Sequence, residues 1–142
     1  MEFTNAFRTA LLVSYAFYFC MIRERQLRYL VLSYAPSAIS ESSVPIAVIL
    51  FEPQAICTGF CKAEFGARWK EDVLRLDPEA DIGNLELFRR DVDVQLGRSE
   101  SRAALLETIQ DSFSNAIRIS VSGDCMAEDP TEELRHLSSA YL

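Results

Sequence analysis

The sequence has little of what most catalytic sites are built from. It contains a single histidine, His136, and neither GxxxxGK nor GxGxxG, so it offers no recognisable nucleotide-binding loop. Its four cysteines form no CxxC pair and are not spaced like zinc ligands, so we interpret them as small buried hydrophobic residues. Only five glycines and five prolines occur among 142 residues, which excludes collagen-like and linker-like segments. We therefore expect a globular protein without a cofactor and, on balance, without an active site.

Positive charge is also scarce. Fourteen Lys and Arg residues face 21 Asp and Glu residues, for a net charge of -7. Such a protein repels nucleic-acid phosphates and anionic membranes on average, so we expect neither as a partner. The acidic residues gather near the end of the chain, at Asp124, Glu128, Asp129, Glu132 and Glu133. This pattern suits a partner with a basic surface, and solubility alone explains it equally well.

Residues 1–20 form an apolar leader that differs from the rest of the chain. Its apolar run, from Thr9 to Ile22, is shorter than the ~20 residues of a membrane span, and the leader lacks the basic start and small-residue cleavage site of a secretory signal. Met21 opens a more ordinary stretch, so we expect it to be the true start, with residues 21–142 forming one cytoplasmic domain. If the leader belongs to the folded protein, we expect it to pack on the domain or on another chain.

Strand-forming residues dominate the next part of the sequence. β-branched and aromatic residues predict three strands, at Leu27–Tyr34, Ile46–Phe51 and Ala55–Cys61. The second is apolar on both faces, which predicts a central strand covered on both sides. In the third, Cys57 and Cys61 would share one face of the sheet. Gly59 either leaves room for close packing there or marks a bulge.

After Gly66 the apolar period changes from two to about 3.6, which predicts helices. We expect a short helix carrying Trp69, Val73 and Leu76, a second helix capped by Asn84 and ended by Gly97, and a third from Ser99 with the stripe Leu105, Leu106, Ile109, Phe113 and Ala116. A half-buried strand at residues 117–122 follows, then a helix capped by Asp129 with Pro130 in its first position. The order β-β-β-α-α-α-β-α predicts an α+β fold, an antiparallel sheet of about four strands with three to four helices, which we place on one side of the sheet.

Several stretches together resemble a bacterial family described as domain of unknown function thirty thirty-seven. They are LRYLVLSYAP, PIAVILFEP, LRLDPEADI and IRISVSGDCMAEDPTEELRHL, and the resemblance covers about residues 25–142. The family's Asn-x-Gly is replaced here by Pro45-Ile46-Ala47, and its preceding Glu aligns with Ser42, beside Glu41. If those polar residues carry an activity, the resemblance implies that this chain has lost or altered it. Some family members are encoded beside kinases similar to the HipA toxin, which implies a regulatory or toxin–antitoxin pairing.

Four residues are candidates for binding: Glu41, Arg68, Trp69 and Lys70. Glu41 is a candidate through the resemblance. Trp69 is favoured as a core anchor beside Val73, and the alternative is a partner-binding hot spot with Arg68 and Lys70 as its polar rim.

Other polar residues give weaker signals for chemistry. We interpret His136 as an ordinary residue of the last helix. Asp91 and Asp93 diverge by about 200° around a helix, so we interpret them as surface charges.

The sequence therefore favours a non-enzymatic regulatory or protein-interaction module. Its partner would be another protein, such as a HipA-like kinase, or a second copy of the chain, because an open antiparallel sheet leaves edges that need covering. The alternative is a small nuclease or hydrolase in which at least three carboxylates converge on a divalent metal ion.

Overall fold

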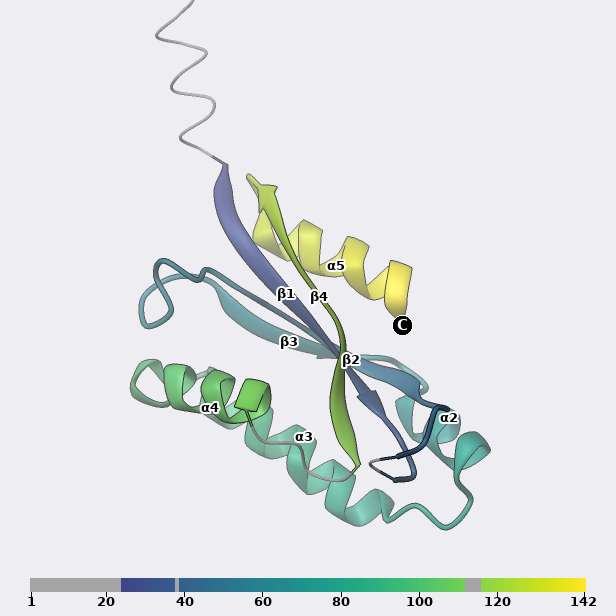
Figure 1. Cartoon of the computed structure of the whole chain (residues 1–142). Helices are drawn as coiled ribbons and strands as arrows, with labels where there is room; N and C mark the ends of the chain where they lie inside the picture. The colour runs from purple at the N-terminus through teal and green to yellow at the C-terminus, as the bar shows by residue number, and fades with distance from the viewer. Residues whose placement is uncertain (1–23, 38, 112–115) are drawn as a thin grey trace, which may run out of the picture.

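The computed structural model describes residues 24–37, 39–111 and 116–142 (Figure 1). The expectations for residues 1–20, Met21 and Phe113 lie outside these residues. Along the chain the elements are β1 (Arg25–Tyr34), β2 (Val44–Phe51), β3 (Cys61–Phe65), α2 (Trp69–Leu76), α3 (Ile82–Leu96), α4 (Ser99–Asp111), β4 (Ile117–Ala127) and α5 (Pro130–Tyr141). This confirms the α+β class and the predicted order of strands and helices.

The four strands form one antiparallel sheet in the order β3-β2-β1-β4. The two central strands, β1 and β2, are the two most apolar segments of the sheet, in line with the prediction for β2. β1 pairs with β4 along its whole length, from Arg25 opposite Ala127 to Tyr34 opposite Ile117. An irregularity in this register lies between Val31 and Leu32.

Helices cover both faces of the sheet, so the prediction that they lie on one side is wrong. On one face, side chains such as Leu32 and Ile49 pack with residues of α2, α3 and α4. On the other, Val31 and Val48 pack against Leu134 of α5, and Figure 1 shows α5 on the opposite side from α3 and α4. The physical reason is that β1 and β2 are apolar on both faces, so a single helical layer would leave one face in water. Among the described residues, no helix has the length and apolar character needed to cross a bilayer.

The helix ends follow from their capping residues. Asp129 accepts hydrogen bonds from the backbone N–H groups of Thr131 and Glu132, and Pro130 begins α5, as predicted. Asn84 does not cap α3, because Asp81 does so three residues earlier, accepting the Asn84 N–H at 3.1 Å. Asn and Asp both cap helices well, so the sequence pattern alone did not distinguish Asn84 from Asp81 as the cap.

The third strand begins at the residue where it was expected to end. Residues 52–60 form a closed turn instead, in which Glu52 Oε1 accepts the Phe60 N–H at 2.9 Å and the Phe60 carbonyl accepts the Glu52 N–H at 3.0 Å. A Cβ on Gly59 would lie 2.7 Å from the Ala55 carbonyl oxygen, so this glycine serves close packing within the turn and not a bulge. Cys57 is consequently exposed and Cys61 is buried in β3, and the prediction that they share a sheet face is wrong.

Candidate interaction site

Three of the four predicted binding residues lie together at the start of α2. The Trp69 side chain is only 6 % exposed and packs in the core with Val73, its ring edge-on to Phe65 at 5.9 Å between centroids. Trp69 therefore anchors the core, which leaves little of its surface for a partner. Arg68 is exposed beside it, and Lys70 Nζ lies 5.7 Å from the centre of the Trp69 ring.

The fourth residue, Glu41, lies exposed in the connection between β1 and β2. Among the described residues, the one ring or charge contact within the set of four joins Lys70 to Trp69. The geometry thus gathers Arg68, Trp69 and Lys70, and it provides no contact that joins Glu41 to them. Their role in binding stays a prediction.

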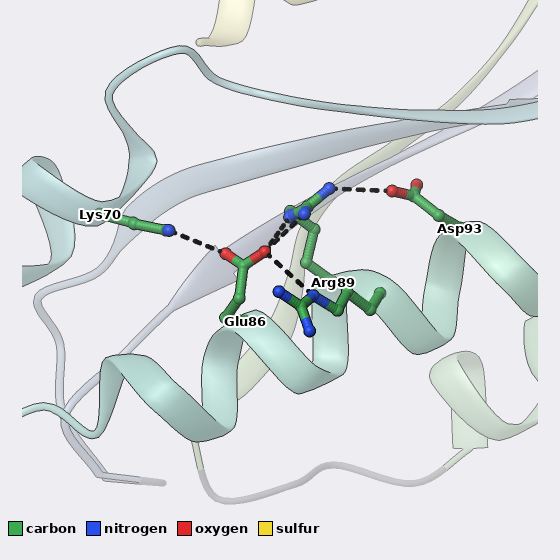
Figure 2. A network of polar contacts seen from close by, with 5 residues as sticks. Lys70, Glu86, Arg89 and Asp93 are labelled. Atoms are coloured by element: carbon green, nitrogen blue, oxygen red, sulfur yellow. Dashed lines mark hydrogen bonds and ion pairs between the residues drawn. The ribbon is translucent and has the colours of Figure 1, made fainter.

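Lys70 takes part in an ion-pair network that holds α2 to α3 (Figure 2). Glu86 of α3 contacts Lys70 Nζ through Oε2 at 3.0 Å and accepts a hydrogen bond from Arg89 Nε through Oε1 at 2.9 Å. The hydrogen bonds from Arg89 and then Lys70 lower the pKa of the Glu86 carboxyl from 4.5 to about 2. On the next turn Arg89 also pairs with Asp93 at 3.1 Å. The Lys70 side chain therefore forms an ion pair within the chain, with Glu86.

The remaining candidates for chemistry do not assemble into a catalytic or metal site. Asp91 accepts a long hydrogen bond from Gln95 at 3.4 Å, and both Asp91 and Asp93 lie on the exposed surface of α3, as predicted. His136 is exposed on α5. Within the described ranges, no three His, Cys, Asp or Glu side chains gather as metal ligands.

Two buried groups are held in their protonated forms. Burial raises the pKa of the Cys61 thiol to about 11, although the nearby Arg102 partly opposes this. Such a thiol is a poor nucleophile at neutral pH, because the thiolate is the reactive form. The Tyr34 phenol has its pKa raised to about 12 by burial and by the 2.6 Å hydrogen bond that it donates to Asp77.

The two edges of the sheet differ in how well they are protected. β3 is an edge of only five residues, it exposes Lys62 and Glu64, and α3 packs alongside it. β4 is an edge of 11 residues that contains neither lysine nor proline. Within the part of the chain that the structure describes, no strand pairs with the outer side of β4. Short length, lysine, proline, other charged side chains, bulges and helical cover are the usual devices that keep an edge from pairing with another chain. β4 has none of the first three, and it does have two charged residues, Arg118 and Asp124, and a register shift in its pairing with β1.

A hollow of about 430 Å³ lies beside β4 on the face that carries α4. Its lining consists of Arg28, Leu30, Gln110, Ile119, Ser122, Gly123 and Asp124. Arg28 Nε donates to Asp124 Oδ1 at 2.9 Å across the two strands, and this exposed pair forms part of the polar lining. Met126, 55 % exposed, follows on the same strand. The hollow has room for a side chain from a strand laid against β4.

No protein-family model, no curated protein and no solved structure matches this chain. The resemblance to the family of unknown function therefore stays an expectation.

The opposite face of β4 is fixed to α5 by an aromatic cluster. The Tyr29 ring lies over Gly123, its partner across the strands, and a Cβ at Gly123 would lie 2.6 Å from the Tyr29 hydroxyl oxygen. Tyr29 also meets Tyr141 of α5, with ring centroids 6.0 Å apart and hydroxyl oxygens 3.4 Å apart. The Tyr141 hydrogen bond, followed by burial, raises the pKa of Tyr29. These contacts hold β4 to β1 and α5 at this glycine.

Sequence reasoning found only the first half of β4. The predicted strand, residues 117–122, stopped where Gly123 and Asp124 weaken strand propensity. The strand continues to Ala127 because Tyr29 packs over Gly123, an aromatic compensation for the missing side chain. The available signal was the alternation after Val121, in which residues 122, 124 and 126 are exposed and residues 123, 125 and 127 are half-buried.

Proposed function

We propose that this chain is a non-enzymatic protein-interaction module that binds a partner chain by strand addition at the outer edge of β4. The observation that carries the proposal is the contrast between the two edges: β3 is short and protected, whereas β4 is 11 residues long and contains neither lysine nor proline. In strand addition, backbone hydrogen bonds supply affinity and alternate side chains supply specificity. Each such bond contributes about 0.5–1.5 kcal/mol net, so about five of them fall short of the roughly 8 kcal/mol of a micromolar complex, and side-chain contacts must supply the rest.

The hollow beside β4 supports the same proposal. It lies next to the edge and is lined by apolar Leu30 and Ile119 together with the polar Arg28, Ser122 and Asp124. A side chain from an added strand gains apolar contact with this lining and reaches a polar group at the same time. Side chains of a strand alternate between its two faces, so a pocket on one face would contact every second side chain of the added strand. This contact would give the module its specificity.

The resemblance supplies one kind of partner. A kinase similar to HipA fits the regulatory pairing that the resemblance implies. We place the module in the cytoplasm, and what supports this is that the described cysteines, Cys57, Cys61 and Cys125, are free thiols.

The test uses two matched lysine substitutions. Ser122→Lys places a charge at an exposed position in the middle of β4, and Ser139→Lys places the same charge at an exposed position of α5. Each variant is co-expressed with a kinase similar to HipA, and amide hydrogen exchange is measured in any complex. We expect slowed exchange in β4, binding lost in Ser122→Lys and binding retained in Ser139→Lys.

Two results would count against this function. Equal binding by both variants, with protection elsewhere on the chain, would overturn the β4 edge as the site. A rise in Tm on adding Mg²⁺ or Mn²⁺ would instead favour the alternative, a carboxylate-based metal hydrolase.

A further inference from the structure

The geometry points to a small-molecule site, separate from β4, that takes a free α-amino acid with an apolar side chain. The site is a hollow of about 330 Å³ formed where β2 begins, by the start of that strand, α2 and the end of α5. Its apolar walls come from five residues: Val44, Pro45, Leu76, Tyr141 and Leu142. None of these residues belongs to β4, so the inference goes beyond the proposed function and does not depend on it.

Two side chains of opposite charge complete the lining of this hollow. They are Asp72 and Arg75, which lie one turn apart on α2. The Arg75 Nη1 and Asp72 Oδ1 atoms are 4.0 Å apart, which is too long for a hydrogen bond. Across residues 24–37, 39–111 and 116–142, the structure shows no other hydrogen bond or ion pair for either side chain. The carboxylate of Asp72 and the N–H groups of Arg75 are therefore available to a ligand.

Two other hollows lack such an available pair. Beside β4, Arg28 Nε already donates to Asp124 Oδ1 at 2.9 Å. In a hollow of about 300 Å³ beside β3, Arg102 donates to a backbone carbonyl at 3.0 Å, and Asp93 pairs with an arginine of its own helix at 3.1 Å. The hollow at α2 is thus distinguished by combining apolar walls with an acid and a base that lack close partners.

A free α-amino acid has the groups that this arrangement would bind. Its carboxylate accepts hydrogen bonds from the Arg75 guanidinium, which suits carboxylates because it presents parallel N–H groups. Its ammonium group donates to the Asp72 carboxylate. A single carbon atom separates the two charged groups of an amino acid, so both can reach a pair of side chains that lie 4.0 Å apart.

The rest of the hollow selects the side chain of the amino acid. The volume lies within the range of roughly 300–1,000 Å³ that is usual for small-molecule sites. An apolar side chain gains contact with Val44, Leu76 and Leu142. A charged side chain would lie against the same apolar walls without a partner, which opposes its binding.

The first test titrates the full chain with L-leucine, followed by the NMR shifts of its backbone amides. Three analogues each remove one group: N-acetyl-L-leucine lacks the ammonium group, L-leucinamide lacks the carboxylate, and glycine lacks the side chain. We expect saturable shifts at Val44, Leu76 and Leu142, with a Kd of about 1 mM or tighter for L-leucine. Each analogue should bind about tenfold more weakly or worse.

The second test removes one charge of the site at a time. Arg75→Gln and Asp72→Asn alter exposed groups whose long ion pair contributes little to stability, so both variants should fold, as checked by circular dichroism. Arg90→Gln is the matched control, because Arg90 is also exposed on a helix and makes only a long ion pair, at 3.7 Å with Glu86. Each variant of the site should raise the Kd for L-leucine about tenfold, and the control should leave it unchanged. Asp72→Asn should not weaken the residual binding of N-acetyl-L-leucine, which has no ammonium group to lose a partner.

Three results overturn the inference. The first is an absence of saturable shifts at ligand concentrations about ten times the expected Kd. The second is equal binding of L-leucine and its two capped analogues, and the third is unchanged binding of L-leucine in both Arg75→Gln and Asp72→Asn. None of these results bears on strand addition, because the substituted residues lie on α2 and the proposed function is tested at β4.

Discussion

Replacing Gly123 by alanine tests the close contact between Tyr29 of β1 and Gly123 of β4. The new Cβ would lie 2.6 Å from Oη, 2.7 Å from Cζ and 2.8 Å from Cε1 of Tyr29, all inside the 3.4 Å at which ordinary van der Waals contact begins. The Tyr29 ring must therefore move away from the strand. In moving it leaves the Tyr141 ring, whose centroid is 6.0 Å away.

The expected cost follows from three contributions. Overpacking of this kind costs about 1–3 kcal/mol, and the Tyr29 ring is only partly buried, so we take the lower end of that range. Loss of the contact with Tyr141 adds about 0.5–1 kcal/mol. Alanine regains about 0.5–1 kcal/mol over glycine in a strand. The net prediction for Gly123→Ala is a loss of about 1 kcal/mol, or about 3–5 °C in Tm for a chain of this length.

The assay is urea unfolding of a double-mutant cycle with Tyr29→Ala. Once the ring is removed, the clash is gone, and Gly123→Ala should become neutral or stabilise the protein by up to about 1 kcal/mol. Gly83→Ala is the matched control, because a Cβ there meets its nearest neighbour, Asp81 Oδ1, at an ordinary 3.4 Å. The control should not destabilise the protein. An equal loss from Gly123→Ala in both backgrounds would refute the reasoning.

Three further predictions concern protonation and reactivity. Because the pKa of Glu86 is lowered from 4.5 to about 2, its contribution to stability should be complete above about pH 4.5 and be lost as the pH falls toward 2, and Glu86→Gln should remove this dependence from unfolding curves. The pKa of Tyr34 is raised from 10.0 to about 12, so the stability that it contributes should be lost as the pH rises from 10 to 12, with a midpoint near 12 in an absorbance titration of the folded protein that Tyr34→Phe abolishes. Iodoacetamide at neutral pH should modify exposed Cys57 well before buried Cys61, as followed by peptide mass mapping.

Each of these has a contrary outcome. A carboxyl titration of Glu86 near 4.5 would mean that its ion pairs with Lys70 and Arg89 do not form in solution. A Tyr34 midpoint near 10 would mean that its phenol is neither buried nor bonded to Asp77. Equal modification rates at the two cysteines would contradict the start of β3 at Cys61.

The elements that the sequence predicted best are those with local causes. Asp129 and Pro130 specify the start of α5 within two residues, and the change of period after Gly66 specifies α2. The error at β3 arose because Ile56, Thr58 and Phe60 alternate like a strand while Glu52 closes them into a turn. That closure depends on a side chain eight positions away, which an alternation pattern does not contain.

The placement of the helices and the candidate site depended on long-range pairing. The apolar character of both faces of β2 already required two covering layers, and that requirement conflicted with helices on one side. The conflict was visible in the sequence, although it did not show which helix lies on the second face of the sheet. Whether a strand lies at an edge depends on which strands flank it, so the edge position of β4 could not be predicted from its residues alone. Trp69 is the most conspicuous aromatic residue of the sequence. It serves the core, as favoured, and not a binding surface.

The pairing of β1 with β4 also sets the order in which the chain can fold. The contact between Arg28 and Asp124 spans 96 positions. During synthesis, most of the domain is therefore made before β4 is available to pair with β1. At 5–20 residues per second that delay is roughly 5 to 20 s. Through that interval β1 and β2 present apolar surfaces that α5 has not yet covered and an edge that β4 has not yet filled. The nascent hairpin is then open to pairing with other chains, and long-range pairing of this kind folds slowly. Aggregation during expression should thus depend more on the speed of translation than on the stability of the finished fold.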